Sequence, residues 1–152
     1  MGDIQMKDVI FKKATDLNME DIMKLEIDVF EGEQEIPAEL IPISLENCPQ
    51  WWCALLDETV IGAIAAWRED NQIHLGRFAI DSKYRRLHIG TKLVAHCIND
   101  LFSQGIDEIH IEAREITVKI LCDMGAKITG EPVEFYKGTV TPMILHKKDY
   151  SN

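Results

Sequence analysis

The chain has 152 residues, of which 46% are hydrophobic, and a formal net charge of −10. This length predicts one domain, residues 1–152, which buries about two-thirds of the surface of the unfolded chain. The negative charge argues against nucleic acid as a partner, because phosphate backbones require a basic surface. No apolar run approaches the ~20 residues of a membrane span, and residues 1–6 lack a signal-peptide pattern.

The four cysteines form no C-x-x-C pair, and no cysteine–histidine spacing predicts a zinc or other metal site. Cys97 falls on the apolar stripe of a predicted helix. This pattern favours reduced thiols in the protein core and a cytoplasmic location.

Hydrophobic periodicity predicts the elements in chain order. A strand at 9–11 precedes a helix at 19–30, whose residues Ile22, Leu25 and Val29 share one face. Strands at 51–56 and 60–67 form a hairpin, and a fourth strand covers 73–80. A helix at 90–102 and a strand at 108–112 follow, which predicts a parallel strand pair with a right-handed crossover. The chain then predicts a helix at 116–124 ended by Gly125, a strand at 126–130, a loop at 131–142 and a last strand at 143–146.

Residues 77–92 combine a short strand, a basic turn and a helix start. The first amide groups of a helix lack internal partners and carry partial positive charge, which favours an anion such as phosphate. Lys83, Arg85, Arg86 and Lys92 crowd the same turn, and Gly90 has no Cβ to keep a ligand from the backbone. The alternative interpretation is a solvated basic turn that binds nothing.

Neither nucleotide-binding fingerprint, G-x-x-x-x-G-K-[ST] or G-x-G-x-x-G, occurs in this stretch. The turn instead resembles the acyl-coenzyme A loop of the GNAT superfamily of N-acyltransferases, because Arg85-x-x-His88-x-Gly90 is similar to that family's Arg/Gln-x-x-Gly-x-Gly/Ala signature. His88 departs from it. The resemblance implies an α/β (α+β) fold with a mixed, mostly antiparallel twisted sheet of six to seven strands. Its fourth and fifth strands would be parallel, and about four helices would flank it.

A second stretch, Val29-Phe30-Glu31-Gly32-Glu33-Gln34-Glu35-Ile36-Pro37, resembles a Val-Phe-x-x-Glu-Gln-x-x-Pro motif of a bacterial GNAT subgroup. There the motif lies beside the acceptor pocket, which implies that Phe30, Glu33 and Gln34 bind substrate. Its glutamates predict a cationic acceptor, a small amine or polyamine rather than an acidic amino acid. The alternative is a solvated acidic loop.

The resemblance implies transfer of an acyl group, acetyl by default, from acetyl-coenzyme A (acetyl-CoA) to an amine of a small molecule or peptide. A main-chain amide near 78–80 would stabilise the developing oxyanion. Glu112 is the first candidate base and His74 the second. At the position of Leu121, many family members have a tyrosine that protonates the departing thiolate. Leucine cannot donate a proton, so Tyr136 or solvent would protonate the thiolate here. The implied cofactor-binding residues are Phe78, Ala79, Ile80, Arg85, Arg86, Leu87, His88, Ile89, Gly90 and Thr91.

Two other functions stay open at this point. One is a non-catalytic acyl-CoA-binding or regulatory module, which Leu121 favours. The other is a simple phosphate or nucleotide binder, which would accept nucleotides lacking the pantetheine arm. The expected partners are an acyl-CoA and an amine, and the sequence leaves a homodimer open.

Overall fold

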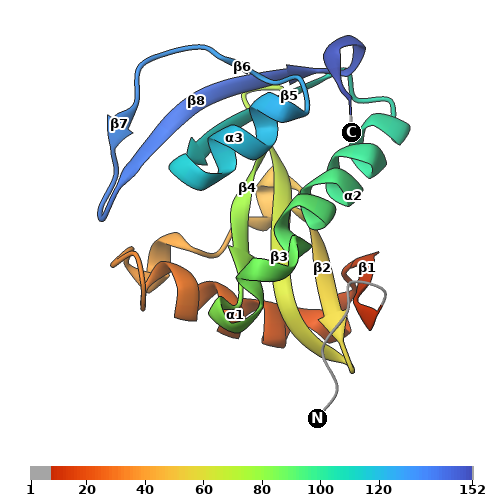
Figure 1. Ribbon diagram of the computed structural model, residues 1–152, viewed down its shortest axis with the longest axis vertical. Coiled ribbons are helices and arrows are strands. Elements are labelled where there is room, and N and C mark those ends of the chain that lie inside the picture. Colours follow the sequence, from red (N-terminus) through yellow and green to blue (C-terminus); the bar gives the residue numbers. More distant parts are fainter. Residues whose placement is uncertain (1–7, 152) are drawn as a thin grey trace.

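The computed structural model describes residues 8–151, which contribute to one eight-stranded sheet (Figure 1). Three α-helices accompany the sheet in these residues: α1 (Met19–Phe30), α2 (Ile89–Ser103) and α3 (Glu115–Asp123). The strands are β1 (Ile10–Lys13), β2 (Gln50–Leu56), β3 (Thr59–Glu69), β4 (Gln72–Ile80), β5 (Glu108–Arg114), β6 (Lys127–Ile128), β7 (Val133–Glu134) and β8 (Thr139–His146).

The strand order is β1-β2-β3-β4-β5-β8-β6, with β7 paired to β8. Strands β1 to β4 are antiparallel neighbours, whereas β4 and β5 are parallel. Helix α2 makes the crossover that a parallel pair requires. The predicted fold, a mixed and mostly antiparallel sheet with a parallel fourth and fifth strand, is confirmed.

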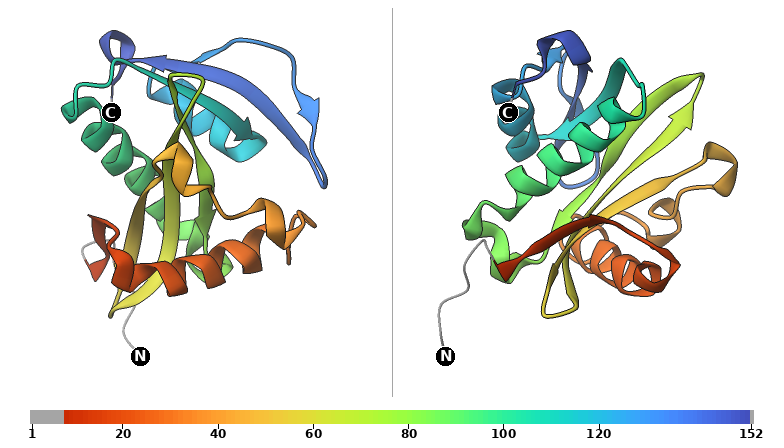
Figure 2. Two further views of the ribbon diagram at one scale, coloured as in Figure 1. Left: turned by 180° about the vertical axis from the view of Figure 1, so that it is seen from behind. Right: turned by 90° about the vertical axis from the view of Figure 1, so that its right-hand side faces the viewer.

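Helices cover both faces of the central strands. Helix α1 packs against β3 and β4, and α2 packs against the opposite face of β1 to β3, as the right-hand view of Figure 2 shows. The core is divided accordingly: Ile22 and Ala63 belong to the cluster on the α1 side, and Trp52 and Leu93 to the cluster on the α2 side. Strand β3 is buried from Val60 to Ala66 because both of its faces are covered.

The helix predictions are confirmed at residue level. Helix α1 spans the predicted 19–30, and α2 extends the predicted 90–102 by one residue at each end. Cys97 is fully buried on the apolar stripe of α2, and all four cysteines are free thiols. Gly125 follows α3 with φ +105°, where a Cβ would collide with the carbonyl oxygen of Asp149. Only glycine fits there without strain.

The predicted loop at 131–142 is wrong. Strand β7 lies within it, and β8 begins at Thr139, four residues before the predicted start. Pro142 is accommodated inside β8 although it has no N–H to donate, because its carbonyl still accepts a hydrogen bond of 2.9 Å from Thr129 N. The two-residue strands β6 and β7 bring the sheet to eight strands. Within residues 8–151, no helix has the length and apolar content needed to cross a membrane.

Candidate active site

The central strand β4 is interrupted by a bulge. Its register with β3 passes from Ala63↔Ala79 to Ala65↔Gly76, so that Arg77 and Phe78 lie opposite the single residue Ile64. Arg77 has φ +57°, in the left-handed region. A bulge of this kind leaves its extra residue out of the ladder and turns the backbone outward. The main-chain groups of Arg77 and Phe78 therefore lie outside the regular ladder between β3 and β4.

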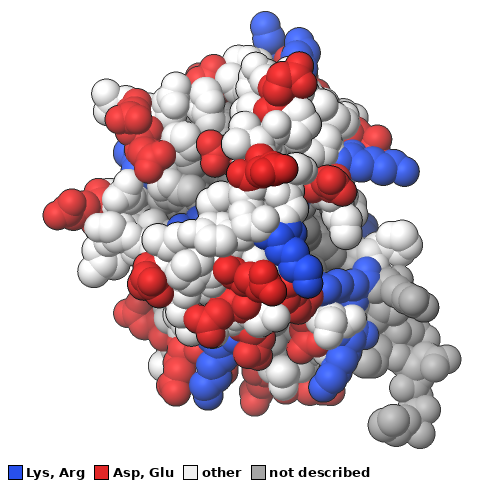
Figure 3. All heavy atoms as spheres, turned by 90° about the vertical axis from the view of Figure 1, so that its left-hand side faces the viewer, with Lys and Arg blue, Asp and Glu red and all other residues white. Residues whose placement is uncertain are grey.

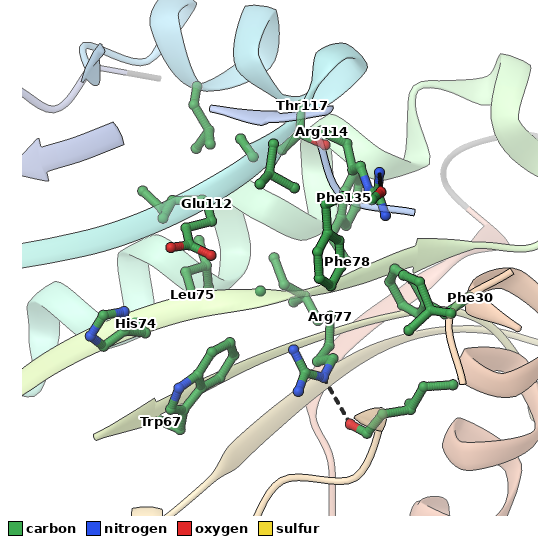
Figure 4. Close-up of a pocket in the computed structure, with 18 of the residues that line it drawn as sticks. Phe30, Trp67, His74, Leu75, Arg77, Phe78, Glu112, Arg114, Thr117 and Phe135 are labelled. Atoms are coloured by element: carbon green, nitrogen blue, oxygen red, sulfur yellow. Dashed lines mark hydrogen bonds between the residues drawn. The ribbon is translucent and has the colours of Figure 1, made fainter. Parts of the chain in front are cut away.

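Strands β4 and β5 separate beside this bulge. Their parallel register contains three residue pairs and ends at Leu75↔Ile111. A cavity of about 260 Å³ opens there, with walls from α1, β3, β4, β5 and the segment after β7. Figure 4 shows Glu112 directed from β5 toward β4, with His74, Trp67, Arg77 and Phe78 around the same cavity.

The predicted cofactor turn follows β4 directly. A 3₁₀ turn at Ser82–Leu87 leads to His88 in the left-handed conformation (φ +60°), and α2 begins at Ile89. Histidine is among the residues that adopt this conformation more readily than most, so the departure from glycine is accommodated. Lys92 N donates to His88 O at 3.3 Å, and the amides of residues 89–91 belong to the first turn of α2, where N–H groups have no partner within the helix.

The cofactor-binding candidates divide into buried and exposed groups. Ala79, Ile80 and Ile89 belong to the core, Phe78 is half-buried in the cavity wall, and His88 and Thr91 are exposed. The side chains of Arg86 and Leu87 lie outside what the structure describes.

Gly90 has a packing role that the sequence did not indicate. A Cβ on Gly90 would lie 2.8 Å from Phe78 Cζ. The space over the glycine is therefore taken by the Phe78 ring, so Gly90 permits close packing between α2 and the bulge. Its role in ligand binding stays a prediction.

Arg85 joins the two motifs that the sequence analysis treated separately. Its guanidinium forms a bidentate ion pair with the Glu33 carboxylate, with Nη1–Oε1 at 2.8 Å and Nη2–Oε2 at 2.9 Å. Its Nε donates to Ile80 O at 3.0 Å. In this arrangement Arg85 links the end of β4 to the segment after α1. The geometry alters two expectations, because Arg85 is not a free phosphate ligand and Glu33 is not a free carboxylate.

The other residues of the acceptor-side motif lie close by. Phe30 ends α1 and forms part of the cavity wall, with Ile36 N donating to its carbonyl at 2.9 Å. Gln34 is half-buried outside the cavity lining, and its Oε1 is shielded from solvent without a hydrogen-bond partner among the described residues.

Two of the three catalytic candidates meet at the cavity. Glu112 and His74 both line it, from β5 and β4. The His74 ring stacks on Trp67 at 6.1 Å between centroids, and its Nε2 lies 3.9 Å from Glu69 Oε2. That nitrogen is buried and makes no hydrogen bond within residues 8–151.

Tyr136 lies elsewhere. It is 50% exposed in the turn between β7 and β8, edge-on to Phe135, and Phe135 rather than Tyr136 lines the cavity. Leu121 is fully buried and also lines the cavity, so α3 presents no proton donor at that position.

Three charged residues of this region received no role from the sequence. Arg77 donates from Nε to Ile41 O (2.8 Å) and from Nη2 to Leu40 O (3.0 Å), and its guanidinium lies 5.2 Å from the centre of the Trp67 ring. Arg114 ends β5 and lines the cavity. Glu26 is fully buried on α1, where both of its carboxylate oxygens lack a hydrogen-bond partner among the described residues.

Burial explains the electrostatics of these groups. Desolvation raises the pKa of Glu26 well above its usual range, and the nearby Arg77 charge opposes this shift to a smaller extent. Desolvation lowers the pKa of Arg77, which Glu26 and Glu69 counteract, and also lowers the pKa of Arg114. The signal that could have found these residues is a charged side chain inside an otherwise apolar strand or helix face.

The bulge in β4, the separation of β4 from β5 and the turn that leads into α2 lie next to one another, as the resemblance of the loop motif implied for the strands and turn. A model of the acetyltransferase (GNAT) family matches residues 19–119, and the chain belongs to this family. No curated protein matches the sequence. Whether the chain falls in the bacterial subgroup suggested by residues 29–37 stays a prediction. Within the described residues, no group of three or more potential ligands could hold a metal ion.

Solved structures agree with the fold. A GNAT-family acetyltransferase from Staphylococcus aureus has 21% identity and a TM-score of 0.69, covering 91% of this chain and 98% of its own. An acyl-CoA N-acyltransferase from Pseudomonas aeruginosa has 17% identity and a TM-score of 0.76, covering 90% and 97%. Escherichia coli ElaA has 14% identity, the same TM-score of 0.76 and the same coverage. At these identities the likeness establishes the fold and leaves the substrate open.

Proposed function

We propose that the protein transfers an acetyl group from acetyl-CoA directly to an amine of a small molecule or peptide. This proposal rests on one observation: the β4 bulge, the split between β4 and β5, and the turn that leads into α2 lie next to one another. Family membership supports the acyltransferase class. The proposal goes further than the family in two respects, since it names acetyl as the acyl group and an amine as the acceptor.

The cofactor-side residues fit a pyrophosphate and a pantetheine arm. The amides of Ile89, Gly90 and Thr91 in the first turn of α2 suit phosphate oxygens, since the start of a helix attracts anions. The split between β4 and β5 would receive the arm. Acetyl-CoA supplies the acyl group as an activated thioester, and the bulge at Phe78 would present a main-chain amide to the carbonyl oxygen as negative charge develops there.

Acyl transfer also requires a neutral amine, because an ammonium has no lone pair and a lysine-like amine has an unperturbed pKa of about 10.4. Glu112, or His74 across the cavity, would take the proton directly or through water. The nitrogen then bonds to the carbonyl carbon and the carbon–sulfur bond breaks. Since Leu121 cannot donate a proton and Tyr136 lies off the cavity lining, solvent is the simplest source of the proton for the departing thiolate.

The amine end of the acceptor is expected to be cationic when it arrives. Glu69 and Glu112 face the cavity, and acidic side chains are spread over the face of the molecule in Figure 3. Because Glu33 is paired with Arg85, we expect these two carboxylates, rather than Glu33, to attract the cationic acceptor. The free thiols fit the predicted cytoplasmic location.

Thiol release from acetyl-CoA across a panel of amines, polyamines and peptides tests the activity. We expect release that depends on the amine. Acetyl-CoA should also raise the melting temperature by mass action, and Gly90→Val should abolish that rise because its side chain would displace the Phe78 ring. The control is Thr59→Val, at an exposed position that starts β3 outside both the turn and the cavity lining.

The rival function is a non-catalytic acyl-CoA-binding module, which Leu121 and the position of Tyr136 favour. Thermal stabilisation by acetyl-CoA without thiol release from any amine would support the rival. Stabilisation by free nucleotides equal to that by acetyl-CoA would point instead to a simple nucleotide binder.

A further inference from the structure

The charged residues around the cavity are arranged in a definite order. Strands β4 and β5 are parallel, so residues further along each strand lie further along the cavity. On β4, His74 comes before Arg77, and on β5, Glu112 comes before Arg114. The fifth charged lining residue, Glu69 on β3, is paired with Gln72 at the start of β4. Glu69 and His74 therefore lie at one end and Arg114 at the other, and the Arg77 guanidinium lies beside the Trp67 ring, on which His74 stacks.

Arg114 has a donor without an acceptor. It follows Glu112 by two positions on β5, so the two side chains project from the same face of the strand. Its Nη1 donates to Phe135 O at 2.9 Å, and its guanidinium lies 5.2 Å from the centre of the Phe135 ring. Its Nη2 is shielded from solvent and has no partner within residues 8–151. A buried charged donor left unpaired is costly, so it calls for an acceptor from outside the chain.

Arg77 adds positive charge to the wall of the same cavity. Its side-chain hydrogen bonds go to two neutral carbonyl groups, those of Leu40 and Ile41. Glu26 and, to a smaller extent, Glu69 oppose the lowering of its pKa, and the raised pKa of Glu26 favours the neutral acid. The cavity thus carries two guanidinium groups, those of Arg77 and Arg114, inside a chain whose formal net charge is −10.

We infer that the acceptor is a small zwitterion, a free amino acid, which places its ammonium toward Glu112 and its carboxylate toward Arg114. Planar guanidinium groups match carboxylates in geometry and charge. The cavity, at about 260 Å³, is below the range of about 300–1,000 Å³ that is usual for drug-sized ligands, which favours a small acceptor. This inference rests on the proposed acyl transfer and specifies its substrate class.

The arrangement argues against two other acceptor classes. A polyamine would place a second cation against the unpaired Nη2 of Arg114. A dicarboxylic amino acid would place its additional negative charge in a cavity that also holds Glu69 and Glu112. Amino acids with neutral side chains satisfy both ends.

The test compares acceptors that differ only at the carboxylate. Each neutral amino acid is assayed for thiol release from acetyl-CoA beside its carboxamide and its decarboxylated amine, with spermidine as the polyamine. For the side chain that is accepted best, we expect kcat/KM for the free acid to exceed that for the carboxamide by about 10- to 100-fold, since a charge-assisted hydrogen bond is lost. A carboxamide, simple amine or polyamine that matches or exceeds the free acid overturns the inference while leaving the acyl transfer in place.

Variants of Arg114 test whether this residue causes the preference for the free acid. Arg114→Gln should raise KM for the free acid until the two acceptors differ by no more than about threefold, with kcat/KM for the carboxamide unchanged. Arg114→Lys should retain part of the preference because it keeps the charge. The matched control is Arg68→Gln, an exposed arginine on β3 that does not line the cavity. An undiminished preference in Arg114→Gln overturns the assignment.

Failure of the proposed function has a different signature. Absence of thiol release with every amine, although acetyl-CoA still raises the melting temperature, counts against acyl transfer itself and the inference falls with it. Because the acceptor comparison uses the unmodified protein, it stays decisive even where an Arg114 variant does not fold.

Discussion

The residues that would hold the cofactor and those that surround the acceptor reach the cavity by different routes. The cofactor side is one continuous stretch, from Phe78 on β4 through the 3₁₀ turn to Lys92 on α2, and its inward side chains Ile80 and Ile89 are buried in the core. The acceptor side is assembled from α1, β3, the part of β4 before Phe78, β5 and the residues that follow α1 and β7.

The two sides also differ in what they bury. Burial on the cofactor side is apolar, which stabilises the fold. The acceptor side holds Glu26, Arg77 and Arg114 partly or wholly away from water, with several polar atoms unpaired. Such groups cost stability unless something pairs with them. The cofactor side therefore stabilises the fold whether or not a ligand is bound, whereas the acceptor side is the part of the cavity whose unpaired polar atoms a ligand would satisfy.

The largest expected effect separates chemistry from binding. Glu112→Gln should lower kcat by about 10²-fold, since a general base contributes that much or more, and acetyl-CoA should still raise the melting temperature. Glu108→Gln, on the same face of β5 but outside the cavity lining, is the control and should stay near the unmodified rate. Full activity in Glu112→Gln, with a loss in His74→Asn, would move the base to β4.

The next effect concerns the buried carboxyl of the acceptor side. Glu26→Met should raise the free energy of unfolding at pH 8 by about 1–3 kcal/mol, because it removes a buried group with unpaired oxygens. Urea denaturation measures the change, and Glu20→Met on the exposed side of α1 is the control. A destabilised Glu26→Met variant would mean that the carboxyl is needed by Arg77.

The pH dependence of that effect has a definite sign. The folded state binds the Glu26 proton more tightly than the unfolded chain does, since burial raises the pKa of this carboxyl. Its contribution to stability is therefore greatest below the unfolded pKa of about 4.3 and declines as pH rises through the folded pKa. Glu26→Met should gain little at pH 4 and progressively more toward pH 8. A gain that is constant with pH would contradict this linkage.

A smaller effect measures how strongly the Glu33–Arg85 ion pair links the acceptor side to the cofactor side. A double-mutant cycle on Glu33→Gln and Arg85→Gln should give a coupling energy of about 0.5 kcal/mol in urea denaturation, because both side chains are 42% exposed and solvent screens the pair. In the same variants, Glu33→Gln should tighten acetyl-CoA binding, since it removes negative charge beside the anion-binding turn. Glu39→Gln serves as the control. Unchanged or weaker binding would show that the Glu33–Arg85 pair supports the turn instead.

The smallest effect is expected at Tyr136. Its hydroxyl belongs to an exposed turn and does not line the cavity, so Tyr136→Phe should change kcat by less than about twofold. Steady-state kinetics with a saturating acceptor measures this. A loss near 10²-fold would mean that the β7–β8 turn closes over the cavity during the reaction and that Tyr136 is the acid.

The fold could be predicted from sequence where its signals are local. Apolar spacing located α1 and α2 to within one residue, and Gly125 marked the end of α3. The predictions failed where pairing overrides local signals. The first part of β8 pairs with β7 on one side and with β5 on the other. This pairing forms both strands, although Pro142 argues locally against a strand.

For the site, the sequence by itself determined the strand, turn and helix start proposed to bind the cofactor, because elements that follow one another in the chain need no distant contact to come together. It also proposed Glu112 and His74 as candidate bases, since both are expected near the splayed ends of the parallel strands, and both line the cavity. Only the tertiary structure decided that Arg85 pairs with Glu33, that Phe78 fills the space over Gly90, and that Arg77 and Arg114 line the same cavity. These are contacts between segments far apart in the chain, and their partners follow from strand register and helix packing rather than from any residue's neighbours in sequence.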